Sequence, residues 1–304
     1  MRYRFINEGK GAYPIKLLCR VMKVSTSAYH AYASGKSYVL SATKTVLAKK
    51  VEAAFYLHRR RYGSRRITAE LAAQGTPVGR FAVRSLMRQK SLQAISARRF
   101  VPRTTDSRHT LTPSANLLLD SQNAPHKPRE VIIGDITYLP LQSGKWSYLA
   151  SWQDKFTKRI VGWAVSNRMT DELVTSALEK AIQNRSVERG TIIHTDQGSQ
   201  YVSNNFRAVL AETGCRQSMS RRGNCYDNAT AESFFSRYKA ELLEGGTFES
   251  VSQARSETFS YIEGYYNRVR RHSALGYKSP EEFEREISIT KKGLRSERVV
   301  SSKT

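Results

Sequence analysis

Two neighbouring stretches, TIIHTDQGSQY at residues 191–201 and SRRGNCYDNATAESFFSRYKAEL at residues 220–242, are central to this chain. The first is a short apolar run followed by Asp196, and the second has helical patterning and contains Glu232. A third carboxylate, Asp135, lies in the earlier apolar run VIIGDITYL. Three carboxylates from separate elements can share one site only if the fold brings them together.

The sequence from residue 130 onward alternates between strand-like and helix-like segments. Runs rich in β-branched residues predict strands, and longer periodic runs, one of them with Thr170 as N-cap and another ended by Gly214, predict helices. The expected strands are 131–141, 145–154, 157–166, 191–195 and 215–220, and the expected helices are 170–185, 203–214, 228–244 and 251–271. This order predicts an α/β layered domain with a mixed five-stranded sheet and flanking helices.

The first 100 residues predict only helices. Ile15, Leu18, Cys19 and Met22 follow one helical face, and Ser25 can cap a second short helix, a pattern compatible with a helix-turn-helix or with a generic helical hairpin. Residues 42–57 and 66–74 predict two more helices, with Ser64 as an N-cap and Gly75 as a stop.

A further helix is predicted after Pro77. Its apolar stripe consists of Val78, Phe81, Val83, Leu86 and Met87. Arg80, Arg84 and Arg88 form a basic row at four-residue spacing, and the preceding turn HRRRYGSRR adds Arg65 and Arg66. An arginine row on an amphipathic helix suits DNA contact, and a merely solvated face is the alternative.

Changes in composition suggest the domain limits. We expect a helical DNA-binding module at 1–40, a second helix-turn-helix-like module at 41–100, a basic linker at 101–127, a catalytic core at 128–285 and a basic tail, disordered by default, at 286–304.

The net charge of +24 over 304 residues indicates a polyanionic partner. Residues 1–110 hold 23 lysines and arginines against four acids, but charge alone does not separate DNA from RNA. Three widely spaced cysteines argue against a disulfide framework or a zinc site. We see no signal peptide and no apolar run long enough for a membrane span, so we expect a cytoplasmic protein.

Three converging carboxylates would repel one another unless cations neutralise them. Their hard oxygen ligands favour Mg²⁺ or Mn²⁺. Two such ions can activate a nucleophile and stabilise the leaving oxygen of a phosphodiester.

The sequence resembles the Asp-Asp-Glu transposases and integrases with a ribonuclease-H-like core, and specifically the OrfB product of IS-three-type bacterial insertion sequences. The resemblance covers residues 1 to about 285. It rests on DITYLP at 135–140, HTDQGSQY at 194–201, SRRGNCYDNATAESFFSRYKAEL at 220–242 and YNRVRRHSALGYKSPEEFE at 266–284. The N-terminal helical segments also resemble that family's DNA-binding region.

The resemblance implies roles for individual residues. Asp135, Asp196 and Glu232 would be catalytic ligands of two Mg²⁺ or Mn²⁺ ions, and Lys239 would contact DNA of the element end. Arg221, Arg222 and Asn228 would touch DNA, and Gly223, Asn224 and Asn228 lie in the family's motif around the glutamate, where they would shape the site or touch DNA. His194 would at most support Asp196 from outside the site, and structural packing is the favoured alternative for it. Water would then free a 3′-OH at the element end, and that 3′-OH would attack a second phosphodiester, first giving a circular intermediate.

The sequence departs from the family in two respects. The family usually has Trp and Thr where Ile132 and Gly134 stand here. The chain also lacks a long leucine heptad, so an upstream-frame OrfA portion could be required as partner or fusion. We expect double-stranded DNA, both terminal inverted repeats and target, as substrate and a homo-oligomer as the active form.

Three other functions fit parts of the sequence. A non-catalytic DNA-binding regulator of transposition would need only the basic first 110 residues. A tyrosine recombinase is disfavoured because His272 does not begin an HxxR motif. A serine hydrolase is disfavoured because Gly198-Ser199 does not form a GxSxG elbow.

Overall fold

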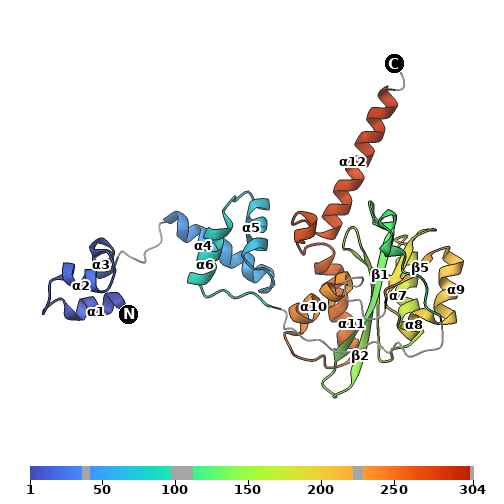
Figure 1. Cartoon of the computed structure of the whole chain (residues 1–304), viewed down its shortest axis with the longest axis horizontal. Helices are drawn as coiled ribbons and strands as arrows, with labels where there is room; N and C mark the ends of the chain where they lie inside the picture. The colour runs from blue at the N-terminus through green and yellow to red at the C-terminus, as the bar shows by residue number, and fades with distance from the viewer. Residues whose placement is uncertain (36–41, 97–111, 222–228, 302–304) are drawn as a thin grey trace. The chain divides into compact units, whose positions relative to one another are not determined.

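The computed structural model describes residues 1–35, 42–96, 112–221 and 229–301. The chain divides into two compact units, Met1–Ala94 and Ile95–Thr304. The first is helical and the second contains the sheet (Figure 1).

Three short helices form the first module: α1 (Arg2–Gly9), α2 (Ile15–Val21) and α3 (Thr26–Ala33). They enclose a small core of Ile6, Leu18, Cys19 and Tyr29. Ser25 caps α3 as predicted, because its Oγ accepts the Ala28 N–H at 3.1 Å. Helix α1 was not predicted.

The second module consists of α4 (Ala42–Leu57), α5 (Ser64–Ala73) and α6 (Arg80–Gln89). The Ser64 prediction is wrong, because Gly63 is the N-cap of α5 and Ser64 is its first helical residue. Gly75 ends α5 with a φ of +72° as predicted. The apolar stripe is wrong at Phe81, which is 79% exposed, whereas Val83, Leu86 and Met87 are buried.

Five strands form one mixed sheet in the order β3-β2-β1-β4-β5. Their bounds are β1 Val131–Pro140, β2 Trp146–Asp154, β3 Ile160–Ser166, β4 Ile192–Thr195 and β5 Arg216–Met219. β1 pairs antiparallel with β2 and parallel with β4, and β2 is also antiparallel to β3, so β2 runs against the other four strands of this sheet. The predicted mixed five-stranded sheet is confirmed.

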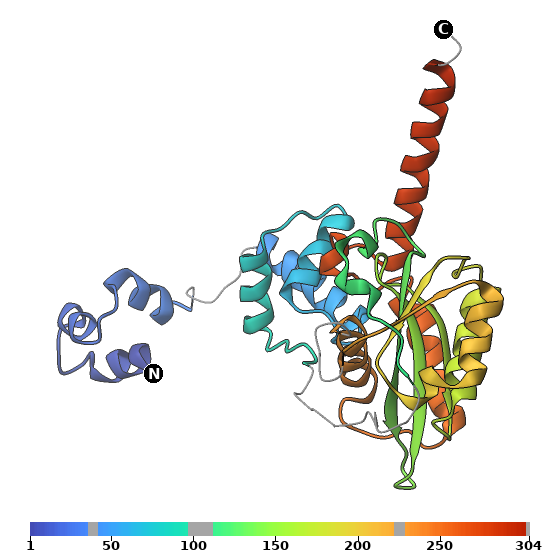
Figure 2. The same cartoon turned by 45° about the vertical axis from the view of Figure 1, so that its right-hand side comes forward.

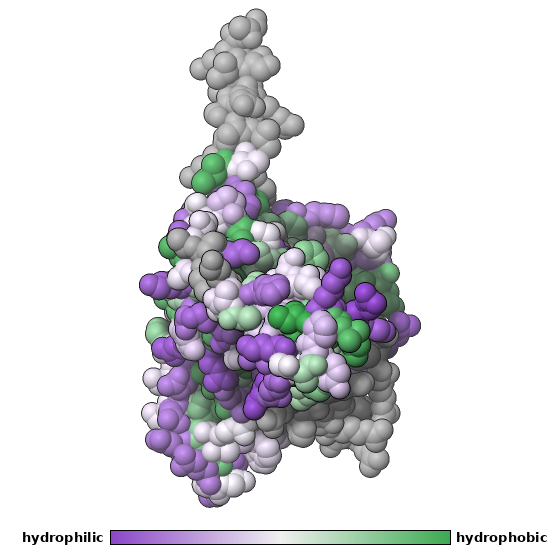
Figure 3. All heavy atoms as spheres, turned by 90° about the vertical axis from the view of Figure 1, so that its left-hand side faces the viewer, coloured by the Kyte–Doolittle hydropathy of each residue, from purple (hydrophilic) through white to green (hydrophobic). Residues whose placement is uncertain are grey.

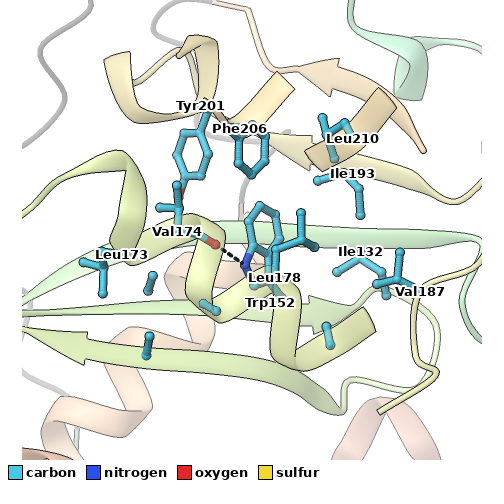
Figure 4. Close-up of a cluster of buried hydrophobic side chains, with 14 of the residues drawn as sticks. Ile132, Trp152, Leu173, Val174, Leu178, Val187, Ile193, Tyr201, Phe206 and Leu210 are labelled. Carbon is cyan, nitrogen blue, oxygen red and sulfur yellow. Dashed lines mark hydrogen bonds between the residues drawn. The ribbon is translucent and has the colours of Figure 1, made fainter. Parts of the chain in front are cut away.

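The unusual Gly134 is explained by its cross-strand neighbour. Gly134 pairs with Trp152 of β2, and a Cβ built at Gly134 would lie 2.1 Å from the indole ring. Trp152 is fully buried, and its Nε1 donates to the Val174 carbonyl at 3.2 Å (Figure 4). The indole therefore fills the space that a side chain at position 134 would take.

Helices cover both faces of the sheet (Figure 1). One face carries α7 (Asp171–Gln183), α8 (Ser199–Val202) and α9 (Asn204–Thr213), which pack on Trp152, Ile132 and Ile193 (Figure 4). Thr170 and Gly214 bound α7 and α9 as predicted, although no side-chain hydrogen bond forms at the Thr170 cap.

The other face carries α10 (Ala229–Leu243) and α11 (Val251–Phe259), which continues as a π-helix over Ser260–Tyr266. The π-helix was not predicted. Helix α12 (Pro280–Ser301) leads away from the sheet (Figures 1 and 2), so the tail expected to be disordered is helical as far as Ser301.

Part of the stretch expected to be a linker belongs to the sheet unit. Ser114 Oγ donates to Gln217 Oε1 at 2.7 Å, and the Leu117 N–H donates to Ser218 Oγ at 3.0 Å. The short 3₁₀ turns Leu117–Leu119 and Ser121–Asn123 follow. Within the described residues, no helix has both the length and the apolar character needed to cross a bilayer.

Candidate active site

The sheet places Asp135 and Asp196 side by side. Ile133 of β1 pairs with His194 of β4 in the last parallel pair, and Asp135 and Asp196 each follow two residues after that pair. The charge of Asp196 acts on Asp135, so the two carboxylates are neighbours. Asp196 directly follows the carboxyl end of β4, next to β1, where the strand order switches from the β2–β3 side to the β4–β5 side. Ligand sites of α/β sheets collect at such positions.

Backbone amides orient both carboxylates. Asp135 Oδ1 accepts the Ile136 N–H at 2.8 Å, and Asp196 Oδ1 accepts the Gly198 N–H at 3.0 Å. A Cβ at Gly198 would lie 3.1 Å from Asp196 Oδ1, which is closer than ordinary contact. Gly198 of the HTDQGSQY motif therefore leaves room for the carboxylate.

Helix α10 brings the third carboxylate to Asp135. Glu232 lies in its first turn and is exposed, and the half-buried Lys239 lies two turns further along the same side. Burial raises the pKa of Asp135 well above its usual range, the neighbouring charges of Asp196 and Glu232 add to the rise, and Lys239 opposes it. The charges of Asp196, Glu232 and Lys239 therefore all lie near enough to act on Asp135.

The pKa of Lys239 also responds to Asp135. Burial lowers the pKa of its ammonium group, and the carboxylate of Asp135 opposes the change. A half-buried cation beside an anionic cluster can bind a phosphate that enters the site.

The three carboxylates do not yet form a closed metal cage. Among the residues that the structure describes, no three His, Cys, Asp or Glu side chains stand close enough to hold one ion. The all-oxygen donor set nevertheless fits Mg²⁺, which usually takes one or two carboxylates and completes its octahedron with water and substrate phosphate.

Tyr201 is a feature that the sequence did not single out. It is 2% exposed, and no described residue accepts or donates a hydrogen bond at its hydroxyl. Burial raises the pKa of Tyr201 well above its usual range, and the charges of Asp135 and Asp196 contribute. Its place in HTDQGSQY, five residues after Asp196, was the only available signal.

His194 lies behind the site and has a structural contact. It is fully buried, and its Nδ1 lies 2.9 Å from Ser218 Oγ on β5. Arg221 follows β5 and is exposed. Arg222, Gly223, Asn224 and Asn228 lie outside the described residues.

The expected DNA-binding arginines differ in exposure. Arg80, Arg84 and Arg88 are all exposed along α6, and Arg65 is exposed on α5. Arg66 is half-buried, with its guanidinium 5.7 Å from the centre of the Tyr62 ring. Figure 3 shows a face of the molecule on which hydrophilic residues surround smaller apolar patches.

Family models match most of both units. Residues 43–100 match an HTH-like domain, and residues 125–225 and 213–280 match two models of the integrase core domain. The first match coincides with the α4–α6 module. The other two cover the sheet, with Asp135 and Asp196, and helix α10, with Glu232.

Known proteins resemble the chain over most of its length. It is 39% identical over 286 residues to the transposase InsF for insertion sequence IS3A of Escherichia coli strain K12, covering 93% of this chain and 98% of that protein. It is 40% identical over 242 residues to the transposase for insertion sequence element IS904 of Lactococcus lactis, covering 80% and 94%. A solved structure, the HTLV-2 integrase catalytic core domain in complex with magnesium, aligns at 15% identity and a TM-score of 0.40 over 53% of this chain and 99% of that chain. From the full-length similarity to the bacterial proteins, we conclude that the chain belongs to the transposases of the IS3 insertion-sequence family.

Proposed function

We propose that this transposase cuts and joins DNA with Asp135, Asp196 and Glu232 as the ligands of two divalent cations. The supporting observation is that Ile133 pairs with His194, two residues before Asp135 and Asp196, and that the charges of Asp196, Glu232 and Lys239 act on Asp135. A raised pKa of Asp135 is the expected consequence of burying a carboxylate that a cation would neutralise.

Bound Mg²⁺ or Mn²⁺ would supply charge neutralisation and an activated water at this site. Asp135 and Asp196 are held by backbone amides, whereas Glu232 is exposed at the start of α10. We therefore infer that Glu232 closes on the other two carboxylates when the site is loaded. Lys239 holds the phosphate of the element end beside them.

The reaction consists of two successive phosphodiester steps, both at this site. Water attacks the phosphodiester at the element end and releases a 3′-OH. That 3′-OH then attacks a second phosphodiester in line, and the leaving oxygen becomes a new 3′ end. Because the DNA's own hydroxyl is the second nucleophile, no protein side chain needs to form a covalent bond.

Residues 1–100, which include the helices α1–α6, would bind the inverted repeats, and the core at 128–285 would perform the chemistry. Arg80, Arg84 and Arg88 of α6 and Arg65 of α5 are exposed and would contact phosphates. The guanidinium of Arg66 also lies over the Tyr62 ring. Arg221 would touch DNA near the core, and we propose the same for Arg222 and Asn228.

Two DNA ends must be joined, so we propose that the active form is a homo-oligomer. The short helical modules contain no long leucine heptad in the printed sequence. An OrfA portion, as a partner or as a fusion, is therefore a candidate for end binding and for dimerisation.

A DNA-cleavage assay tests the proposal. The full chain, a labelled duplex with the element end and Mg²⁺ are incubated, and products are separated on a denaturing gel. We expect the wild type to give a 3′-end nick and joined strands, and Glu232→Ala to bind DNA without reacting. Glu257→Ala, an exposed glutamate of α11, is the matched control and should react normally.

The other outcomes discriminate between functions. If Glu232→Ala reacts as fast as the wild type, the carboxylate mechanism is wrong. If both proteins bind and neither reacts, the chain is a regulator or an incomplete transposase. Fusion to the upstream frame then distinguishes these two, because only an incomplete transposase would gain activity.

A further inference from the structure

The motif YNRVRRHSALGYKSPEEFE at 266–284 has no part in the chemistry proposed above, yet three of its first five residues are buried. Tyr266 is 3% exposed, and Asn267 and Arg270 are 2% exposed. Each bonds to an element far away in the sequence. The structure therefore gives this motif a role inside the core.

Arg270 forms a two-pronged ion pair with Glu241 of the catalytic helix α10. Its Nη2 donates to Glu241 Oε1 at 2.6 Å, and its Nε donates to Oε2 at 2.9 Å. Both side chains are only 3% exposed. Burial disfavours the charged guanidinium, but its bonds to Glu241 raise the pKa of Arg270 above its usual value.

A tyrosine and the π-helix complete the environment of this pair. The Tyr261 hydroxyl donates to Glu241 Oε2 at 2.9 Å, and the Arg270 guanidinium lies 5.7 Å from the centre of the Tyr266 ring. A π-helix bonds residues five apart, and here the Asn267 N–H donates to the Ile262 carbonyl at 3.0 Å. This winding helps Tyr261 and Tyr266 to be buried together near Arg270.

The same motif is anchored to the sheet. Asn267 forms two hydrogen bonds with the backbone of Ile160 in β3, one as donor and one as acceptor, both at 2.9 Å. Gln153 Nε2 of β2 donates to the Tyr266 hydroxyl at 2.8 Å. Arg270 thus connects α10 to a segment that is itself fixed to the strands.

The position of Glu241 on α10 allows the ion pair to fix the rotation of this helix about its axis. At 3.6 residues per turn, Glu241 lies about half a turn around the helix from Glu232 and from Lys239. Between these two sides runs the packed stripe, which contains Ala231, Phe234, Phe235 and Tyr238. Rotation of α10 about its axis would therefore break the ion pair and displace Glu232 in the same motion.

An apolar stripe by itself would hold the helix less strictly. Hydrophobic packing is non-directional, whereas a two-pronged arginine–carboxylate pair fixes distance and angle. A buried ion pair is also a weak source of stability, because an apolar pair of similar size is often as stable or more stable. The pair is therefore better explained by orientation than by stability.

We propose that Arg270 is a positioning residue of the transposase active site: through Glu241 it sets the rotation of α10 and so aims Glu232 and Lys239 at Asp135. This inference rests on the proposed metal site. It also gives the YNRVRR segment a function that does not require contact with DNA.

Manganese binding to the full chain, followed by the EPR signal of free Mn²⁺, tests the proposal without relying on DNA cleavage. The difference between wild type and Asp135→Asn defines the active-site ions. In Glu241→Leu/Arg270→Met we expect that site to bind Mn²⁺ about 10–100-fold more weakly, as for other supporting residues of metal sites. Its thermal stability should equal or exceed that of the wild type.

A second ion pair of the same domain provides the control. Arg159 and Glu284 lie 2.7 Å apart and connect α12 to the residue that precedes β3. Arg159→Met/Glu284→Leu should keep the wild-type Mn²⁺ affinity. Arg270→Lys keeps the charge and loses the planar guanidinium fork, so it should bind Mn²⁺ with intermediate affinity. If the apolar double variant does not fold, Arg270→Lys is used to test the proposal.

Each contrary result has a separate meaning. Wild-type Mn²⁺ affinity in a folded Glu241→Leu/Arg270→Met protein, or in Arg270→Lys, would overturn the positioning role and leave the proposed metal site intact. Equal Mn²⁺ binding by wild type and Asp135→Asn would overturn the metal site, and the positioning role with it.

Discussion

The two units differ in where the charged side chains discussed above lie: those of Met1–Ala94 are mostly exposed, whereas several of those in Ile95–Thr304 are partly or wholly buried. Arg80, Arg84 and Arg88 of α6 are exposed, whereas Val83, Leu86 and Met87 of the same helix are buried. In the sheet unit, Asp135, Lys239 and the Glu241–Arg270 pair are partly or wholly withdrawn from water. The same residue types thus serve in two different electrostatic environments.

This difference bears on how each unit responds to change. Exposed charges interact weakly with one another and are screened by salt, so they suit a long, adjustable contact with DNA phosphates. Buried charges are costly to desolvate and are kept only with a partner or a ligand. Substitutions should therefore change affinity in the first unit, and protonation or stability in the second.

The largest expected effect is on DNA binding. Replacing Arg80, Arg84 and Arg88 by alanine should remove about three phosphate contacts and reduce the slope of log affinity against log salt by about three. We expect affinity for the element end to fall by about 10²-fold or more at low salt. Fluorescence anisotropy with a labelled duplex across a salt series measures both quantities.

Glu172→Ala together with Glu179→Ala removes exposed charges from α7 of the sheet unit and serves as the comparison. Neither glutamate belongs to the expected DNA surface. An unchanged salt slope in the triple arginine variant would show that α6 does not face the phosphates.

The next effect concerns packing at Gly134. Gly134→Ala places a methyl group against the Trp152 indole, which is enclosed by the core, so we expect a loss of about 1–3 kcal/mol in unfolding free energy. Trp152→Val opens space at the same point. The double variant should therefore be more stable than the sum of the two single changes predicts, as denaturant unfolding would show. Strict additivity would contradict the account of Gly134.

A smaller effect is expected from removing the buried charge at Asp135. Its pKa is raised in the folded protein, so its contribution to stability is complete below the unfolded pKa of about 3.9 and is lost as the pH rises through the folded value. Asp135→Asn should therefore unfold at a higher temperature than the wild type at neutral pH when both are free of metal. We expect a gain of about 2–4 °C for each kcal/mol.

Two further measurements check the origin of that gain. The advantage of Asp135→Asn should shrink as the pH is lowered, because the wild-type carboxyl then becomes neutral. It should also shrink when Mg²⁺ is added to the wild type. A difference in melting temperature that stays constant with pH would mean that the aspartate charge is not its cause.

Much of this architecture could be predicted because it is encoded locally. The β-branched runs around Asp135 and Asp196 and the period of α10 each depend on a few neighbouring residues. The convergence of the three carboxylates was expected from a family resemblance and remains a prediction; the parallel pairing of β1 with β4 brings only the strand segments before Asp135 and Asp196 together.

The features that sequence reasoning missed depend on contacts between distant residues. Arg270 and Glu241 are 29 residues apart, and their ion pair has no local signature. Phe81 fits the helical period as well as Val83 does, yet only the placement of α4 and α5 decides which is covered. The lack of a side chain at Gly134 is likewise explained only by Trp152, its neighbour on β2.

The smallest expected effect tests whether the two units are independent. Ser25→Ala removes the hydroxyl that caps α3, and the loss of an N-cap costs about 0.5–2 kcal/mol. Hydrogen exchange of the full chain should show faster exchange in the amides of α3. Ser27→Ala changes an exposed serine within the same helix, where alanine is the better helix former, and should leave this protection equal or slightly higher. Because the two units have separate cores, exchange in β1 and α10 should be the same in all three proteins. Faster exchange in α10 of Ser25→Ala would show that the first helical module stabilises the catalytic core. The two units would then unfold together, despite the difference in where their charges lie.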